Sequence, residues 1–386
     1  MYAAMVSRAV DRLPQLLVSD ADPVAETGVD GISGSHAQLR ALTAAVGALT
    51  PAALSGVVEH PLFAYWSARL RTGAEPVRWP MELGRLMLAK HLVDGSLPDD
   101  GLFLPVGLSG GIQGPDLRPT HLASELAGGL VHVTADQDDV AIRGADFQRR
   151  LAASEMVRPD TWQPVGDADL VVDATDPWFT AFLAAMNEQP KVGPYPKRDL
   201  EAVTVLDQGL RDTYTTALEL LRGSWPEAYA EVTRYVRVVV PFRSKFLVGW
   251  STPLFQGAVF IKAAPGDVVF TFERLVHEAA HQRLFAVQRL TRLHTDPPSR
   301  RLPSALRKDP RPTSGVYHAA FVCGRLVQAI RRVAAQEQDP RWEARLTDLR
   351  AKYWSLSMTL HEHASLTEVG SGMLQQLDED VRATER

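Results

Sequence analysis

Two histidines four positions apart, with a glutamate beside the first, are the residues of this chain best suited to chemistry. The run 276–281 reads Val-His-Glu-Ala-Ala-His. On an α-helix, side chains four positions apart leave the same face about one turn from each other. Two neutral imidazoles at this spacing can bind one metal ion. The run predicts that His277 and His281 are metal ligands, with Glu278 beside them. The alternative is an ordinary amphipathic helix that carries two histidines.

The residues around the motif predict the helix that this spacing requires. Apolar side chains recur at helical intervals from Phe272 to Leu284, and no glycine or proline falls between Thr271 and Leu290. Thr271 is predicted as the N-cap, because a threonine hydroxyl can accept a hydrogen bond from an N–H of the first turn. A β-like run at 257–262 comes just before this helix.

Two histidines do not complete a metal site, because such sites use at least three protein ligands. We predict that His318 is the third. It lies 37 residues after His281, near the start of a helix expected after the arginine- and proline-rich loop 295–312. The alternative for His318 is a histidine packed in the core. Four other residues remain open as third ligands: His361, Glu362, His363 and Glu368.

Length and composition predict a globular protein of two or three domains. The chain has 386 residues, of which 45% are hydrophobic and 23% charged. We expect residues 1–190 to form an N-terminal helical and irregular or β region, with peptide recognition as one interpretation of its role. Residues 191–386 are expected to form the metal-binding catalytic domain, beginning with the loop Lys191–Lys197. The predicted fold class is α+β, mainly helical, with a small mixed sheet next to the His-Glu-x-x-His helix.

Charge and cysteine usage narrow the partners and the compartment. The net charge is −5, from 41 basic and 46 acidic residues, and no basic block stands out, so nucleic acid is not expected as a partner. No apolar run approaches the length of a membrane span, and the N-terminus lacks the apolar core of a signal peptide. The single cysteine, Cys323, fits a reducing cytoplasm and is predicted to be a core residue. We therefore expect a cytoplasmic protein without a membrane partner.

Short blocks in a fixed order resemble a known bacterial family. They are 257–261 with Pro265-Gly266, then 275–281, then 308–312 leading into 315–319, with a weaker match at 366–370. Together they span about residues 240–370. The chain resembles, in this part, the HExxH-motif peptide-modification family, which occurs beside ribosomally made peptide natural products. The N-terminal third matches it only in general character.

The resemblance implies an oxygenase. Members of this type look like iron(II)- and 2-oxoglutarate-dependent enzymes, which use O2 to hydroxylate a side-chain β-carbon in a ribosomally synthesised precursor peptide. His318 falls in the third block, so the resemblance supports His277, His281 and His318 as the iron ligands. Glu278 has no obligatory proton-transfer role in such an enzyme, and would orient a ligand or the substrate.

An oxygenase of this kind also needs a cation for the distal carboxylate of 2-oxoglutarate. Arginine suits this role because its planar guanidinium can bind a carboxylate with two hydrogen bonds. Arg311 and Arg307 lie just before His318 and are predicted to bind the co-substrate, with Arg301 in reserve. The alternative is a basic loop that is simply solvated.

The intact motif leaves two other functions open. In a cytoplasmic zinc metallopeptidase, Glu278 would be the general base that takes a proton from a metal-bound water. In a peptide-binding scaffold without catalytic activity, the motif would hold a structural metal. The oxygenase and peptidase readings both predict a peptide substrate. Residues 257–262 are then either an edge strand that pairs with an extended peptide or an interior strand. Trp250 either lines the cleft or packs in the core.

Overall fold

The structure is a computed structural model that forms two compact units. One unit comprises residues 1–163 with 175–182, and the other comprises residues 164–174 with 183–386. The structure describes residues 41–42, 44–63, 79–99, 101–105, 111–112, 120–122, 130–136, 139–144, 147–156, 165, 170–172, 177–188, 199–203 and 206–384. The predicted loop Lys191–Lys197 lies outside these residues.

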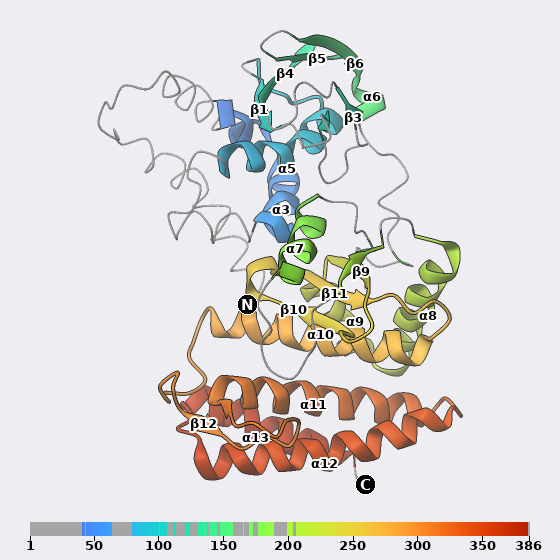
Figure 1. The fold of residues 1–386 in the computed structure, drawn as a ribbon, viewed down its shortest axis with the longest axis vertical. Helices are drawn as coiled ribbons and strands as arrows, with labels where there is room; N and C mark the ends of the chain where they lie inside the picture. Colours follow the sequence, from blue (N-terminus) through green and yellow to red (C-terminus); the bar gives the residue numbers. More distant parts are fainter. Residues whose placement is uncertain are drawn as a thin grey trace. The chain divides into compact units, whose positions relative to one another are not determined.

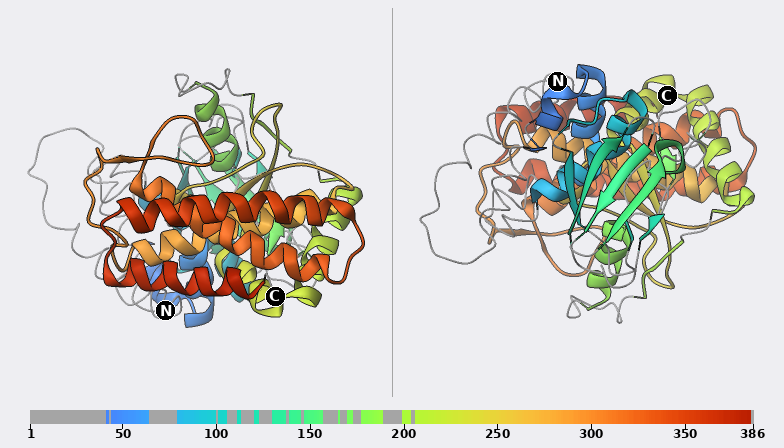
Figure 2. Two further views of the ribbon diagram at one scale, coloured as in Figure 1. Left: turned by 90° about the horizontal axis from the view of Figure 1, so that it is seen from below. Right: turned by 90° about the horizontal axis from the view of Figure 1, so that it is seen from above.

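The first unit contains a four-stranded antiparallel sheet and helices. Its sheet has the order β1-β4-β5-β6, and the right-hand view of Figure 2 looks onto it. The strands are β1 (Leu102–Pro105), β4 (Leu130–Asp136), β5 (Asp139–Arg143) and β6 (Gln148–Ala152), and a separate pair joins β2 (Gly111–Ile112) to β3 (Thr120–His121). The helices are α3 (Pro51–Glu59), α5 (Trp79–Asp94) and α6 (Ala153–Met156). Residues of α7 (Pro177–Glu188) belong to both units.

The second unit contains the small mixed sheet that the sequence predicts. Its strand order is β10-β11-β9-β7, and β8 pairs with β9 off this path. The strands are β7 (Val171–Val172), β8 (Glu201–Ala202), β9 (Val238–Arg243), β10 (Gly249–Ser251) and β11 (Ala258–Lys262). β11 runs parallel to β9 and antiparallel to β10. The run 257–262 is therefore an interior strand, and among the described strands β10 lies at one edge of the sheet.

Helices make up the rest of this unit, and Figure 1 shows them from yellow-green to red. They are α8 (Gln208–Ser224), α9 (Pro226–Tyr235), α10 (Val268–Gln288), α11 (Thr313–Ala334), α12 (Pro340–His363) and α13 (Glu368–Ala383), with a short 3-10 helix, η2 (Pro253–Phe255). α10 packs against α8, α9, α11 and the strands β10 and β11, while α11 also packs against α12 and α13. The α+β prediction, with a small mixed sheet next to the His-Glu-x-x-His helix, is confirmed. None of the described helices is long and apolar enough to cross a membrane.

The helix α10 starts earlier than the sequence suggested. Asp267, not Thr271, is its N-cap, and the Asp267 carboxylate accepts a hydrogen bond from the N–H of Phe270 at 3.2 Å. The prediction of Thr271 was wrong because the turn at Gly266, with φ of 79°, lets the helix begin one turn earlier. Thr271 is instead buried inside the helix.

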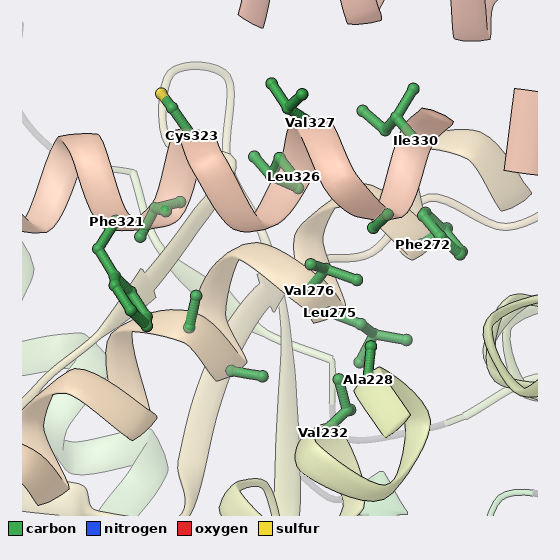
Figure 3. Close-up of a cluster of buried hydrophobic side chains, with 14 of the residues drawn as sticks. Ala228, Val232, Phe272, Leu275, Val276, Phe321, Cys323, Leu326, Val327 and Ile330 are labelled. Atoms are coloured by element: carbon green, nitrogen blue, oxygen red, sulfur yellow. The ribbon is translucent and has the colours of Figure 1, made fainter. Parts of the chain in front are cut away.

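The apolar face of α10 packs into the core of the unit. Figure 3 shows Phe272, Leu275 and Val276 of α10 between α11 and α9. From α11 come Leu326, Val327 and Ile330, and from α9 come Ala228 and Val232. Burying a large apolar side chain stabilises a fold by about 1.5–3 kcal/mol. This packing fixes the rotation of α10 about its axis and turns its histidines to the other side.

A polar contact fixes α10 against the sheet. The side chain of Gln282 is fully buried. Its Oε1 accepts a hydrogen bond from the N–H of Gly257 at 3.1 Å, and its Nε2 donates to the carbonyl of Ala258 at 2.7 Å. Both bonds reach the start of β11, so they set the register of the helix against the strand.

The predicted loop between α10 and α11 is largely irregular and is held at several points. Two short strands, β12 (Arg301–Leu302) and β13 (Arg311–Pro312), pair within it. Asp296 accepts hydrogen bonds from the Thr313 hydroxyl at 2.9 Å and from the Ser365 N–H at 3.1 Å. The loop is therefore attached to the start of α11 and to the segment after α12.

The closest backbone approach in this region is at Gly370, and it generates a stability prediction. A Cβ on Gly370 would lie 1.9 Å from the carbonyl oxygen of Leu293, which belongs to the backbone and cannot move aside. We expect Gly370→Ala to lower the free energy of unfolding by about 2–3 kcal/mol, as overpacking does. Urea unfolding of the purified chain measures this.

The matched control lies in the same helix. A Cβ on Gly372 would meet nothing within 4 Å. Gly372→Ala should raise the free energy of unfolding by about 0.5–1 kcal/mol, since alanine is the better helix former. Equal effects of the two substitutions would contradict the close approach at Gly370.

Candidate metal centre

The motif residues of α10 come together as their spacing predicts. His277, Glu278 and His281 each place a donor atom within 4.8 Å of those of the other two. The two imidazole centroids are 5.1 Å apart. The His277 side chain is 27% exposed, whereas the Glu278 side chain is 2% exposed. The site is thus open to solvent at His277 and closed to solvent at Glu278.

Glu278 lies beneath the edge strand β10. Its Oε2 accepts a hydrogen bond from the Ser251 hydroxyl. A Cβ on Gly249 would lie 2.6 Å from its Oε1, so any larger residue here would require the carboxylate to shift. Burial raises the pKa of Glu278 to about 7, although the Ser251 hydrogen bond and the charge of Arg274 act to lower that pKa. Near neutral pH this carboxyl group can therefore donate or accept a proton.

His318 reaches His281 from the first turns of α11, beside the close group of donors that His277, Glu278 and His281 form. Its Nδ1 lies 3.1 Å from Nδ1 of His281, and the two rings stack with centroids 5.3 Å apart. Two nitrogens that bind one ion at about 2.1 Å and at right angles lie about 3.0 Å apart. The distance also fits a hydrogen bond between two neutral rings. His281 thus contacts His277 on one side and His318 on the other.

A glutamine fixes the far side of the His318 ring. Nε2 of His318 lies 3.0 Å from Oε1 of Gln288, in the last turn of α10. An amide oxygen only accepts, so Nε2 of His318 carries the hydrogen in this pair. The neutral ring then presents the lone pair of Nδ1 toward His281. A ligand histidine is typically held in this way through its second nitrogen.

The three histidines are neutral at physiological pH. Burial, with a smaller contribution from the charge of Arg311, lowers the pKa of His281 to about 3 and that of His318 to about 4. Burial also lowers the pKa of His277 well below its usual value. A neutral imidazole has a free lone pair, which is the form that binds a metal.

The residues present fit a divalent metal ion. Nδ1 of His277 is buried and meets no hydrogen-bond partner among the described residues. Leaving such an atom unpaired costs about 1–3 kcal/mol, and a metal ion bound to this nitrogen would supply the missing partner. Imidazole and carboxylate donors suit iron(II) and zinc alike. A metal site on α10, and with it a metal-dependent enzyme, is what this arrangement supports.

The site opens into a cavity of about 770 Å³. His277, Glu278, His281 and His318 line it, as do the predicted clamp residues Arg311 and Arg307. Arg301 does not line the cavity; its guanidinium donates to the carbonyl oxygens of Pro298 and Arg300. Trp250 also lines the wall.

Cys323 reaches the cavity wall but is buried, as predicted for a core residue. Burial raises the pKa of its thiol to about 11, so it stays protonated at neutral pH.

The other candidates for a third ligand lie elsewhere. Nε2 of His361 is 2.7 Å from the buried carboxylate of Asp378, and His363 is 3.6 Å from Glu362. Glu368 is exposed in the first turn of α13. None of these four lines the cavity. Of the candidates named from the sequence, only His318 is brought to His281.

Sequence reasoning missed three residues of the site: Gly249, Ser251 and Gln288. Gln288 had a signal, because it lies seven residues after His281 and therefore on the same helix face. Gly249 and Ser251 had none, since they reach Glu278 through the folding of β10 over α10.

Compared with known proteins, the chain matches no family model and no curated protein sequence. The functional interpretation therefore depends on this chain's own residues and on how the fold places them.

The raised pKa of Glu278 predicts a pH-dependent stability. The folded chain keeps the Glu278 proton up to about pH 7, whereas the unfolded chain loses it near 4.5. The Glu278 contribution to stability is therefore fully present below pH 4.5 and is lost as the pH rises through 7. Relative to the wild type, metal-free Glu278→Gln should gain up to about 3 kcal/mol of unfolding free energy between pH 4.5 and 8.

Urea unfolding of both proteins at several pH values measures this difference. The histidines titrate in both proteins, so their effects cancel in the subtraction. A wild-type minus variant difference that stays constant with pH would show that Glu278 is ionised throughout.

The ligand assignment predicts which histidines bind metal. His277→Ala, His281→Ala and His318→Ala should each lose at least nine-tenths of the bound metal, because each removes one of three donors. His363→Ala is the matched control, since its ring is half exposed and outside the cavity. Elemental analysis after equilibration with iron(II) or zinc measures the content, and circular dichroism checks folding. Unchanged metal in His318→Ala would refute its role as a ligand.

Proposed function

We propose that the chain is an iron(II)- and 2-oxoglutarate-dependent oxygenase that hydroxylates a side-chain β-carbon in a ribosomally synthesised precursor peptide. The observation that carries the proposal is Arg311, which lines the same cavity as the three histidines. Its charge lowers the pKa of both His281 and His318, so it acts on the site electrostatically. A peptidase does not require a cation in this place, whereas a dicarboxylate co-substrate does.

Each residue then has a defined task. His277, His281 and His318 would hold iron(II), which when bound supplies the activation of O2. Arg311, with Arg307 further out, would bind the distal carboxylate of 2-oxoglutarate. The backbone of Arg311 is fixed because it pairs with Leu302 and stands between two prolines. A preorganised arginine loses less entropy on binding than one in a free loop.

Glu278 and Ser251 would orient the substrate. The carboxyl group is buried and half protonated near pH 7, so it can donate one hydrogen bond while accepting another from Ser251. Directly beside it, Gly249 carries no side chain, so the carboxyl group of Glu278 lies close against the backbone of β10. The pair can therefore hold a polar group of the substrate next to the metal.

The alternative is a zinc metallopeptidase, and Glu278 is the observation that favours it. A carboxylate with a pKa near 7 is well matched to take a proton from water and return it to a leaving amine. Among the described residues that line the cavity, Glu278 is the only acidic one. The two functions thus assign the same histidines but different work to Glu278.

Binding of 2-oxoglutarate decides between them. Anaerobic protein loaded with iron(II) should develop a weak visible absorption band when 2-oxoglutarate is added. Arg311→Gln should weaken 2-oxoglutarate binding by at least tenfold, because an ion pair with two hydrogen bonds is lost. Arg301→Gln is the matched control, since Arg301 lies in the same loop but outside the cavity, and it should leave the affinity unchanged.

The opposite results would support the peptidase. Absence of the band, with zinc tightly bound to the protein as isolated, would overturn the oxygenase proposal. Glu278→Gln then gives a second comparison. A peptidase should lose nearly all activity, whereas an oxygenase should keep a sizeable fraction, because its glutamate only positions the substrate.

A further inference from the structure

The edge strand β10 presents, beside the metal centre, backbone groups that pair with no described strand. The N–H of Lys262 donates to the carbonyl of Val248 at 3.0 Å, which makes this a hydrogen-bonded pair of the β10–β11 ladder. Hydrogen-bonded pairs alternate along antiparallel strands. Trp250 therefore bonds to β11, while the N–H and C=O groups of Gly249 and Ser251 point away from it. Within the described part of the chain, no strand pairs with β10 on that side.

The same two residues face Glu278. Gly249 and Ser251 approach its two carboxylate oxygens, and both line the cavity. Side chains alternate between the faces of a strand. A peptide paired with β10 would accordingly point every second side chain toward Glu278 and the histidines.

Exposed apolar side chains lie at both ends of this edge. Phe246 and Val248, just before β10, are 51% and 41% exposed, and Leu254, just after it, is 41% exposed. Leu306 is 40% exposed and lines the cavity from the loop. Grouped large apolar side chains on a surface indicate a binding region. They would contact the side chains of a bound strand that point away from the metal.

The charge of the cavity selects among peptides. Arg289, Arg307 and Arg311 line it, and in the described part of its wall the one acidic residue is the buried Glu278. Arg289 lies at the end of the edge, where its Nη2 donates to the carbonyl of Pro253 at 3.0 Å. This positive wall favours a neutral or acidic peptide and disfavours a basic one.

We propose that β10 is the substrate-docking edge: an extended, neutral or acidic peptide adds to it as an antiparallel strand. Residues two apart in the peptide exchange hydrogen bonds with Gly249 and Ser251, four bonds in all. The reacting residue lies opposite Gly249, because a directly opposed side chain points to the same face, and on that face Glu278 Oε1 lies 2.6 Å from the Cβ position of the glycine. This inference rests on the metal-dependent function proposed above.

The test uses inhibitors that bind the metal with and without a peptide. The full chain is loaded with zinc, and the affinities of acetohydroxamate and of N-acetyl-Glu-Leu-Leu hydroxamate are measured by calorimetry. The peptide should bind at least tenfold more tightly. Methylation of its backbone nitrogens should remove most of this gain, because it removes the N–H donors. A lysine in place of the glutamate should weaken binding severalfold.

The protein offers a matched pair of variants. Ser251→Pro removes the outward N–H, whereas Ser251→Ala loses the same hydroxyl but keeps the N–H. The gain from the peptide should be lost in Ser251→Pro relative to Ser251→Ala, because both variants lack the hydroxyl and only the proline lacks the N–H; the acetohydroxamate affinity of each variant is its reference. Should Ser251→Pro fail to fold, the methylated inhibitor on the wild-type chain decides alone.

The outcomes separate the two proposals. If acetohydroxamate binds but the peptide adds nothing, or its gain survives both methylation and the proline, docking on β10 is refuted while the metal centre stands. If neither hydroxamate binds to the wild-type chain, the metal centre and the docking edge fall together.

Discussion

The burial of the polar face of α10 is the constraint on which the site depends. One face of this helix packs into the apolar core through Phe272, Leu275 and Val276. The opposite face then places two imidazoles and a carboxylate in the wall of the cavity, where they are largely shielded from water. Desolvation keeps the rings neutral and the carboxyl group partly protonated. The physics that makes the residues costly to bury also prepares them to bind a cation.

The neighbours of α10 lower that cost. Ser251 satisfies Glu278, Gln288 holds His318, and the buried Gln282 joins the helix to the start of β11. Ser251 comes from the sheet, whereas Gln282 and Gln288 belong to α10 itself and bond to β11 and α11. The site is therefore formed by the packing of α10, α11 and β10. The His-Glu-x-x-His run contributes only the residues on α10.

The sequence predicted those parts of the fold that depend on local periodicity. The α+β class, the helix around His277 and the position of His318 near the start of α11 all agree with the structure. The prediction of Thr271 as the N-cap was wrong because the turn at Gly266 lets the helix begin earlier, at Asp267. Strand order could not be read from the chain, since the nearest run to the motif is interior and the three-residue β10 has almost no pattern of its own. Contacts such as Ser251 with Glu278 join residues 27 positions apart and follow only from the folded sheet.

The loop that carries Arg307 and Arg311 is hydrogen-bonded to the segment between α12 and α13. Besides the Asp296 contacts, His294 bridges to Leu366, and the N–H of Thr367 donates to the carbonyl of Leu293 at 3.0 Å. These bonds hold residues 293–296 and 365–367 together and so connect the loop to α13. The loop should therefore not keep its conformation when it is grafted alone onto another protein, because contacts with the C-terminal helices determine that conformation. We expect truncations or fusions at the C-terminus to change the positions of Arg307 and Arg311 in the cavity.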